Sequence, residues 1–222
     1  NASKFAFMHL EDYNPKKPKN IEIIDKWILS KLSSIVKGST KNFMNYEYSH
    51  TKLATETFFW HTFCDNYLEI IKDRLYNAEK RSKEARASAQ YGLYHTLLTI
   101  IKLMAPITPF ITEELYQLYY RKHEKNKSIH ITSWPSLDLT DADAENVGDF
   151  FVYVLQHVRR AKSEKSLSLK KPVKKILAKG KITKADFEKI KEDLIATTNA
   201  EEIVFEPLEK SSKIDYEVVV DI

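Results

Sequence analysis

The sequence predicts a mainly α fold, in which an up-and-down helical bundle is followed by a small α/β unit. Apolar side chains recur at helical spacing through most of the first 130 residues. After Pro172 the periodic segments shorten to lengths typical of strands. Of the 222 residues, 43% are hydrophobic and only four are glycine, so the chain can build a core and lacks the bias of collagen-like or low-complexity proteins.

The first part of the chain predicts two long helices. A lysine-rich loop with Pro15 and Pro18 precedes the first of them. The apolar face of this helix holds Ile24, Ile28, Leu32, Ile35 and Tyr46. Ser49 is the expected N-cap of the second helix. The apolar stripe of the second helix holds Leu53, Trp60, Phe63, Cys64, Tyr67, Ile71 and Leu75.

Two further helices complete the predicted bundle. After a polar stretch at 77–90, apolar residues spread over a wide arc and indicate the most deeply buried helix of the set. This helix is expected to end at Ala105-Pro106. Thr108 and Pro109 then suit the N-cap and the first position of a fourth helix, which runs through Tyr120.

Three predicted parts follow from these patterns. They are the helical bundle at 1–135, a linker with a basic helix at 136–172, and the small α/β unit at 173–222. Pro, Asp and Thr dominate the linker, and the basic helix is expected from about Asn146 to Lys162.

The last part predicts strands around one helix. Strand-like segments lie at 173–178, 203–206 and 216–220, the last with three consecutive valines. Between the first two, Thr183 and Asp186 have the spacing of a helix capping box. About fifty residues are few for an independent core, so we expect this unit to pack on the helix before it.

No catalytic or metal-binding motif is recognisable. The four glycines stand far apart, which argues against a glycine-rich phosphate loop. The single cysteine, Cys64, excludes a disulfide framework and fits a reducing compartment, so we expect a cytoplasmic protein. His61 lies three residues before Cys64, but one such pair makes a poor zinc site. No run of about 18 uncharged apolar residues suggests a membrane span.

Charge is distributed unevenly along the chain. Residues 157–191 hold 13 Lys and Arg against three Asp and Glu, a net charge of +10. Residues 192–222 hold two against nine, a net charge of −7, and the first 156 residues are nearly neutral. Composition alone leaves two interpretations of the basic block: a surface for a polyanion or a solvated lysine-rich face.

Most of the 26 aromatic side chains fall on the apolar stripes and are expected in the core. Phe5 and either Tyr13 or Tyr48 lie near the chain start and the helix junctions instead. Such rings are candidates for exposed platforms, on which unstacked RNA bases stack.

The segment FFWHTFCDNYLE at Phe58–Glu69 resembles a helix of the valyl-tRNA synthetase family. Further matches follow the order of that family. Asn1–Phe5 is similar to its Asn-Ala-x-Arg-Phe element, with Lys4 in place of Arg. Leu103–Leu115 is similar to the Pro-x-x-Pro-Phe-x-x-Glu-Glu-Leu run of class Ia synthetases, with Ala105 in place of a common His. The match is completed by Ser128–Ile131 before Trp134-Pro135.

The resemblance implies a class Ia anticodon-binding domain that docks the anticodon stem-loop of tRNA(Val) as a monomer. The family's catalytic and editing domains would precede residue 1, together with the sites for ATP and Mg²⁺. This stretch would then contain no catalytic residue, no metal and no cofactor, while the parent protein would be a valine–tRNA ligase. The chain shows no long heptad-patterned C-terminal helix, which favours the archaeal-type lineage of the family.

By the same resemblance, Phe5 would stack on an anticodon base and Lys4 would be a nearby cation. The alternative for Phe5 is a place in the bundle core. The expected phosphate contacts are Arg159, Arg160, Lys162, Lys165, Lys170 and Lys171. Two other functions stay open: a non-catalytic helical protein-interaction module with a basic surface, and the equivalent domain of an isoleucyl-tRNA synthetase.

Overall fold

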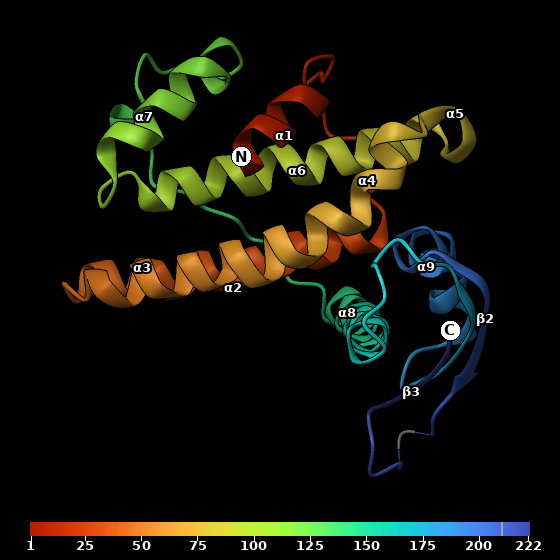
Figure 1. The fold of residues 1–222 in the computed structure, drawn as a ribbon. Helices are drawn as coiled ribbons and strands as arrows, with labels where there is room; N and C mark the ends of the chain where they lie inside the picture. The colour runs from red at the N-terminus through yellow and green to blue at the C-terminus, as the bar shows by residue number, and fades with distance from the viewer. Residues whose placement is uncertain (210) are drawn as a thin grey trace.

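The computed structural model describes residues 1–209 and 211–222, and it confirms the mainly α fold with a small C-terminal α/β unit. The bundle consists of α1 (Ala2–His9), α2 (Ile23–Met44), α3 (Tyr48–Thr57), α4 (Leu68–Tyr76), α6 (Lys83–Met104) and α7 (Pro109–Leu118). The two long helices α2 and α6 run side by side, and α1 and α7 lie over α6 on the side away from α2 (Figure 1). The short helix α5 (Ala78–Arg81) joins α4 to α6.

One continuous helical rod runs from α3 to α4, and its middle is a π-helix, η1, at Phe58–Tyr67. Each π turn takes in one residue more than an α turn, so a stripe drawn at α-helical spacing loses its phase across the segment. Leu53 and Trp60, both expected on the buried stripe, are therefore 64% and 57% exposed. The rod also begins earlier than expected, with Glu47 and not Ser49 at the N-cap.

Short 3₁₀ turns η2 (Tyr120–Lys122) and η3 (Ile129–Ile131) lead from the bundle to α8 (Ala142–Glu164). Helix α8 starts four residues before the expected Asn146, because Asp141 caps it by accepting a hydrogen bond from the Ala144 amide at 2.9 Å. It packs across α2 and is seen nearly end-on in Figure 1. Gly148 permits the close approach, since a Cβ there would collide with the Trp27 ring.

The C-terminal unit is a three-stranded sheet with one covering helix. Its elements are β1 (Val173–Gly180), α9 (Lys184–Thr198), β2 (Ala200–Pro207) and β3 (Tyr216–Asp221). The strand order is β2-β1-β3, with β1 parallel to β2 and antiparallel to β3. As predicted, the Thr183 hydroxyl caps α9 by accepting a hydrogen bond from the Asp186 amide at 3.0 Å.

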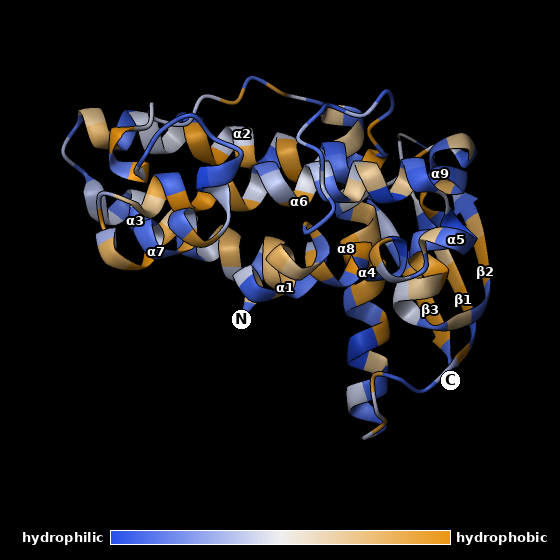
Figure 2. Cartoon of the chain, turned by 90° about the horizontal axis from the view of Figure 1, so that it is seen from above, coloured by the Kyte–Doolittle hydropathy of each residue, from blue (hydrophilic) through white to orange (hydrophobic). Residues whose placement is uncertain are grey.

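A single hydrophobic core runs through the bundle and the C-terminal unit. The sheet packs on α8, where the Phe150 ring meets the rings of Phe205 and Tyr216. Helix α9 packs on α4 as well as on α8, so the unit is fixed to the bundle from two sides. Hydrophobic and hydrophilic residues alternate along α8 (Figure 2), and its buried face includes Phe150, Val154 and Val158. Within the described residues, no helix combines the length and the apolar character needed to cross a bilayer.

Candidate nucleic-acid interface

Helix α1 presents the first predicted contacts at the edge of the bundle. Lys4 is exposed, and the Phe5 side chain is half-buried. The Phe5 ring lies 4.6 Å from the His9 ring and 6.5 Å from the Tyr76 ring, measured between centroids. Tyr76 is itself 60% exposed. Phe5 therefore combines features of the two alternatives, the exposed platform and the core position. Part of its side chain packs on the bundle, and the remainder is within reach of a ligand.

The other two aromatic candidates differ from each other. Tyr48 is 47% exposed, as a platform requires. The prediction for Tyr13 is wrong, because its side chain is only 7% exposed and its ring packs 5.1 Å from that of Tyr94.

Four predicted phosphate contacts lie near the C-terminus of α8 or in the loop that follows it, and we call them the basic end. They are Arg160, Lys165, Lys170 and Lys171, all exposed. Arg160 donates to the Glu164 carboxylate at 2.8 Å, an exposed pair within one helix turn. The chain turns back after α8 at Ser166, which has a positive φ of 54°. Helix α8 extends beyond the bundle toward the side on which α1 lies (Figure 2), and the loop after it returns to α9, where the Asn199 side chain donates to the Lys170 backbone oxygen at 2.9 Å.

Lys162 does not join the basic end, because its side chain faces the interior and is 2% exposed. Its ammonium donates to the backbone oxygens of Leu169 at 2.8 Å and Thr198 at 3.0 Å. The sequence pattern placed it among solvated lysines, but the 165–172 loop folds back over it.

The Arg159 side chain also forms hydrogen bonds within the protein. Its guanidinium donates to the Asp65 backbone oxygen at 2.8 Å and to Asn66 Oδ1 at 3.2 Å. Asn66 in turn donates to the backbone oxygen of His61 at 2.6 Å. Backbone carbonyls of the π-helical segment thus receive side-chain donors, and one of them comes from α8.

The acidic block neutralises most of the basic strand. Because β2 and β3 flank β1, their carboxylates stand beside its lysines. Lys175 pairs with Glu202 at 3.1 Å, and Lys179 pairs with Glu217 at 3.3 Å. Lys181, just after β1, pairs with Asp215 at 2.8 Å. Three lysines in and after β1 are therefore paired, and the positive surface is smaller than the charge count of 157–191 suggests.

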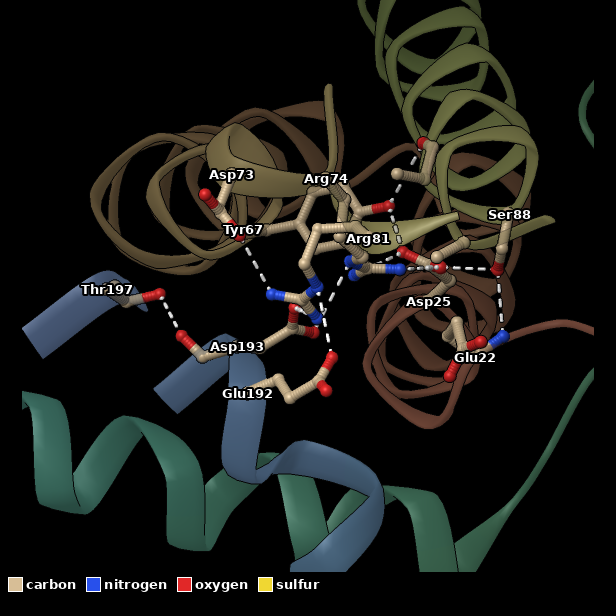
Figure 3. Close-up of polar contacts among 12 residues, drawn as sticks. Glu22, Asp25, Tyr67, Asp73, Arg74, Arg81, Ser88, Glu192, Asp193 and Thr197 are labelled. Carbon is tan, nitrogen blue, oxygen red and sulfur yellow. Dashed lines mark hydrogen bonds and ion pairs between the residues drawn. The ribbon is translucent and has the colours of Figure 1, made fainter. Parts of the chain in front are cut away.

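A buried ionic network lies where α2, α4 and α9 meet (Figure 3). Arg74, 1% exposed, donates to both oxygens of Asp25 at 2.7 and 3.2 Å. Its Nε lies 3.3 Å from the Asp193 carboxylate. Tyr67 also donates to Asp25, at 2.7 Å, and so does the hydroxyl of Ser88. Although burial lowers the pKa of Arg74, the carboxylates of Asp193 and Asp25 raise it more, so the guanidinium stays charged.

Arg81 extends this network to the surface. It lies 2.7 Å from Asp193, 2.9 Å from Asp73 and 3.2 Å from Glu192. Together the two arginines tie α4 and α5 to α9. This network does not follow from the sequence patterns above, although one signal is present. Arg74 follows Tyr67 and Ile71 at helical spacing, which puts a charged residue on an apolar stripe.

The Cys64 thiol and the Glu113 carboxylate are poorly suited to catalysis or metal binding. Burial, and then the Asp65 carboxylate, raise the pKa of the half-buried Cys64 thiol to about 11, so it stays protonated at neutral pH. Glu113 is occupied in structure, since its carboxylate accepts from the amide of Ile129 at 3.0 Å. Among residues 1–209 and 211–222, no three His, Cys, Asp or Glu side chains cluster in a way that could hold a metal ion.

Comparison with known proteins matches residues 25–177 to the family described as the anticodon-binding domain of tRNA ligase. The chain is 38% identical over 226 residues to the valine–tRNA ligase of Rickettsia conorii, covering 97% of the chain and 27% of that protein. It is 38% identical over 208 residues to the valine–tRNA ligase of Wolbachia pipientis wMel, covering 91% and 23%. The chain thus spans about a quarter of the length of these curated relatives.

Proposed function

The chain belongs to the family of anticodon-binding domains of tRNA ligases, and we propose that it docks the anticodon stem-loop of tRNA(Val). One observation carries the proposal. All four side chains of the basic end lie within the residues that match the family, on an exposed helix end whose positive charge is not cancelled by the acidic block. The phosphate backbone of a nucleic acid is the polyanion that such a surface binds best.

The basic end supplies affinity and position rather than sequence discrimination. Lysine and arginine side chains neutralise backbone phosphates and release counterions, which makes binding steeply dependent on salt. Lys165, Lys170 and Lys171 extend from the backbone around the turn that follows α8, so they offer adjacent charges to one RNA strand. The exposed pair between Arg160 and Glu164 is weak enough for a phosphate to displace the carboxylate.

Base recognition is assigned to α1. Phe5 is half-buried against His9 and Tyr76, which fixes the ring, and the exposed part offers a face for an unstacked base. Lys4, at the preceding position, is exposed and offers a positive charge on the same helix. The family match begins after these two residues, so their role rests on the resemblance of Asn1–Phe5 and on the position of the Phe5 ring.

The reaction itself would be carried out by other parts of the whole ligase. In a protein of the relatives' length, this domain would hold the tRNA while other parts bind ATP and Mg²⁺ and attach valine. No residue described above is assigned to that reaction. A monomeric state, a cytoplasmic location and the archaeal-type lineage stay predictions, and the relatives named above are bacterial.

The test compares two RNAs. We expect the chain to bind the anticodon stem-loop of tRNA(Val) more tightly than that of tRNA(Ile), because the two loops share a backbone but differ in their anticodon bases. Fluorescence titration at one fixed salt concentration measures both affinities. Equal affinities would refute the valine assignment, and absence of binding to either RNA would refute the proposed function.

A further inference from the structure

A cleft of about 390 Å³ lies where α4, α8, α9 and the 165–172 loop meet. Arg159, Lys162 and Lys170 line it, together with Glu69. Glu69 is already paired with Lys72, one turn along α4. Three cations from the basic block therefore converge on a cavity that has a single, already paired carboxylate.

Lys162 brings a positive charge to the floor of this cleft without a counter-ion. Its side chain is 2% exposed, and both of its hydrogen-bond acceptors are neutral backbone oxygens. Burial lowers the pKa of Lys162, and no charged neighbour contributes to the shift. A buried charge without an opposite charge is costly, and an ammonium has three donors, of which the described residues use two.

Backbone contacts hold the cleft in shape. Asn199 adopts the left-handed conformation at the C-terminus of α9, and its side chain donates to the backbone oxygen of Lys170 at 2.9 Å. Lys162 holds the adjoining oxygen of Leu169. The rim residue Lys170 is thus fixed at its backbone while its side chain stays exposed. Arg159 uses two of its five donors on the π-helical segment and retains three.

We propose that this cleft is a phosphate site, with Lys162 at its floor, Arg159 in its wall and Lys170 at its rim. The site would receive one phosphate group of the RNA backbone, and to that extent the inference rests on the proposed function. It differs from the general contacts of the basic end, because it is a formed cavity that recognises a single phosphate.

Inorganic phosphate tests the cleft without RNA. Melting temperatures of the chain are measured in phosphate and in chloride at matched ionic strength, for the unaltered chain, Lys170→Gln and Lys171→Gln. Lys171 is the matched control, since it is the exposed neighbour of Lys170 and does not line the cleft. We expect phosphate to raise the melting temperature of the unaltered chain and of Lys171→Gln by ligand linkage. In Lys170→Gln, phosphate affinity should fall about tenfold, the cost of one charge-assisted hydrogen bond.

An equal rise of the melting temperature in all three proteins would reflect the general effect of phosphate on protein surfaces and would overturn the proposal. The absence of any rise in the unaltered chain would overturn it as well. Lys162→Met supplies a second variant. The difference between its melting temperatures in phosphate and in chloride should be smaller than that of the unaltered chain. A titration with the anticodon stem-loop then identifies the source of the phosphate. If the RNA binds and Lys170→Gln leaves its affinity unchanged, the RNA phosphate is excluded from the cleft while the proposed function stands. If the RNA does not bind, the proposed function fails and the phosphate arm still decides the cleft.

Discussion

Phe5 contributes both to packing and to the candidate interface, and a conservative variant separates the two. Phe5→Leu keeps much of the apolar contact with His9 and Tyr76 but removes the aromatic face. We expect it to weaken binding of the anticodon stem-loop by about tenfold, since stacking of one base contributes about 1–3 kcal/mol. The melting temperature should change little. A variant that binds RNA normally, or that loses its fold, would place Phe5 in the core alone.

Single residues were the hardest feature to predict from the sequence. Lys162 and Lys165 belong to the same basic run, yet the first is buried and the second is exposed, because the loop that follows α8 folds back over one side of the helix. Tyr13 was expected at the surface from its place near the chain start and proved to be buried against Tyr94. Burial at such positions depends on tertiary contacts that local patterns do not contain.

At the scale of the element, the start of a helix could be predicted from the sequence where a capping residue or a proline marks it. Thr108 and Pro109 mark the start of α7, and Thr183 caps α9, as the sequence indicated. The π-helical segment was not predictable from spacing, because a 3.6-residue period was assumed throughout. That assumption placed Leu53 and Trp60 in the core, whereas both are exposed.

The buried network determines how α2, α4 and α9 are held together, and Asp25 is its centre. Asp25→Ala would leave the Arg74 guanidinium buried with only Asp193 beside it, and would remove the acceptor of Tyr67 and Ser88. We expect a loss of about 3–5 kcal/mol in the free energy of unfolding, as when one partner of a buried pair is removed. Urea denaturation measures it.

Asp12→Ala is the matched control for this element. Asp12 accepts a two-point hydrogen bond from Arg86, but its side chain is 62% exposed. An exposed pair of this kind contributes about 1 kcal/mol or less. Similar losses for Asp25→Ala and Asp12→Ala would mean that the network does not hold the helices together.

At the scale of the whole molecule, topology determines where the charge of the chain acts. The linear count gave +10 for residues 157–191 and −7 for residues 192–222. The strand order β2-β1-β3 sets the acidic strands on both sides of the basic one, so Lys175 and Lys179 are paired. The charge count therefore overstates the extent of the positive surface, because strand pairing between distant segments is not visible in it.

The dependence of RNA affinity on salt tests the central claim most directly. Affinity for the tRNA(Val) anticodon stem-loop is measured over a range of salt concentrations for the unaltered chain and for a variant with Arg160, Lys165, Lys170 and Lys171 replaced by Gln. Each phosphate contact contributes about 0.7–0.9 to the slope of log affinity against log salt. We expect the slope of the variant to be shallower by about three, with its melting temperature kept because all four side chains are exposed. An unchanged slope would contradict the account, since the RNA would then bind elsewhere on the molecule.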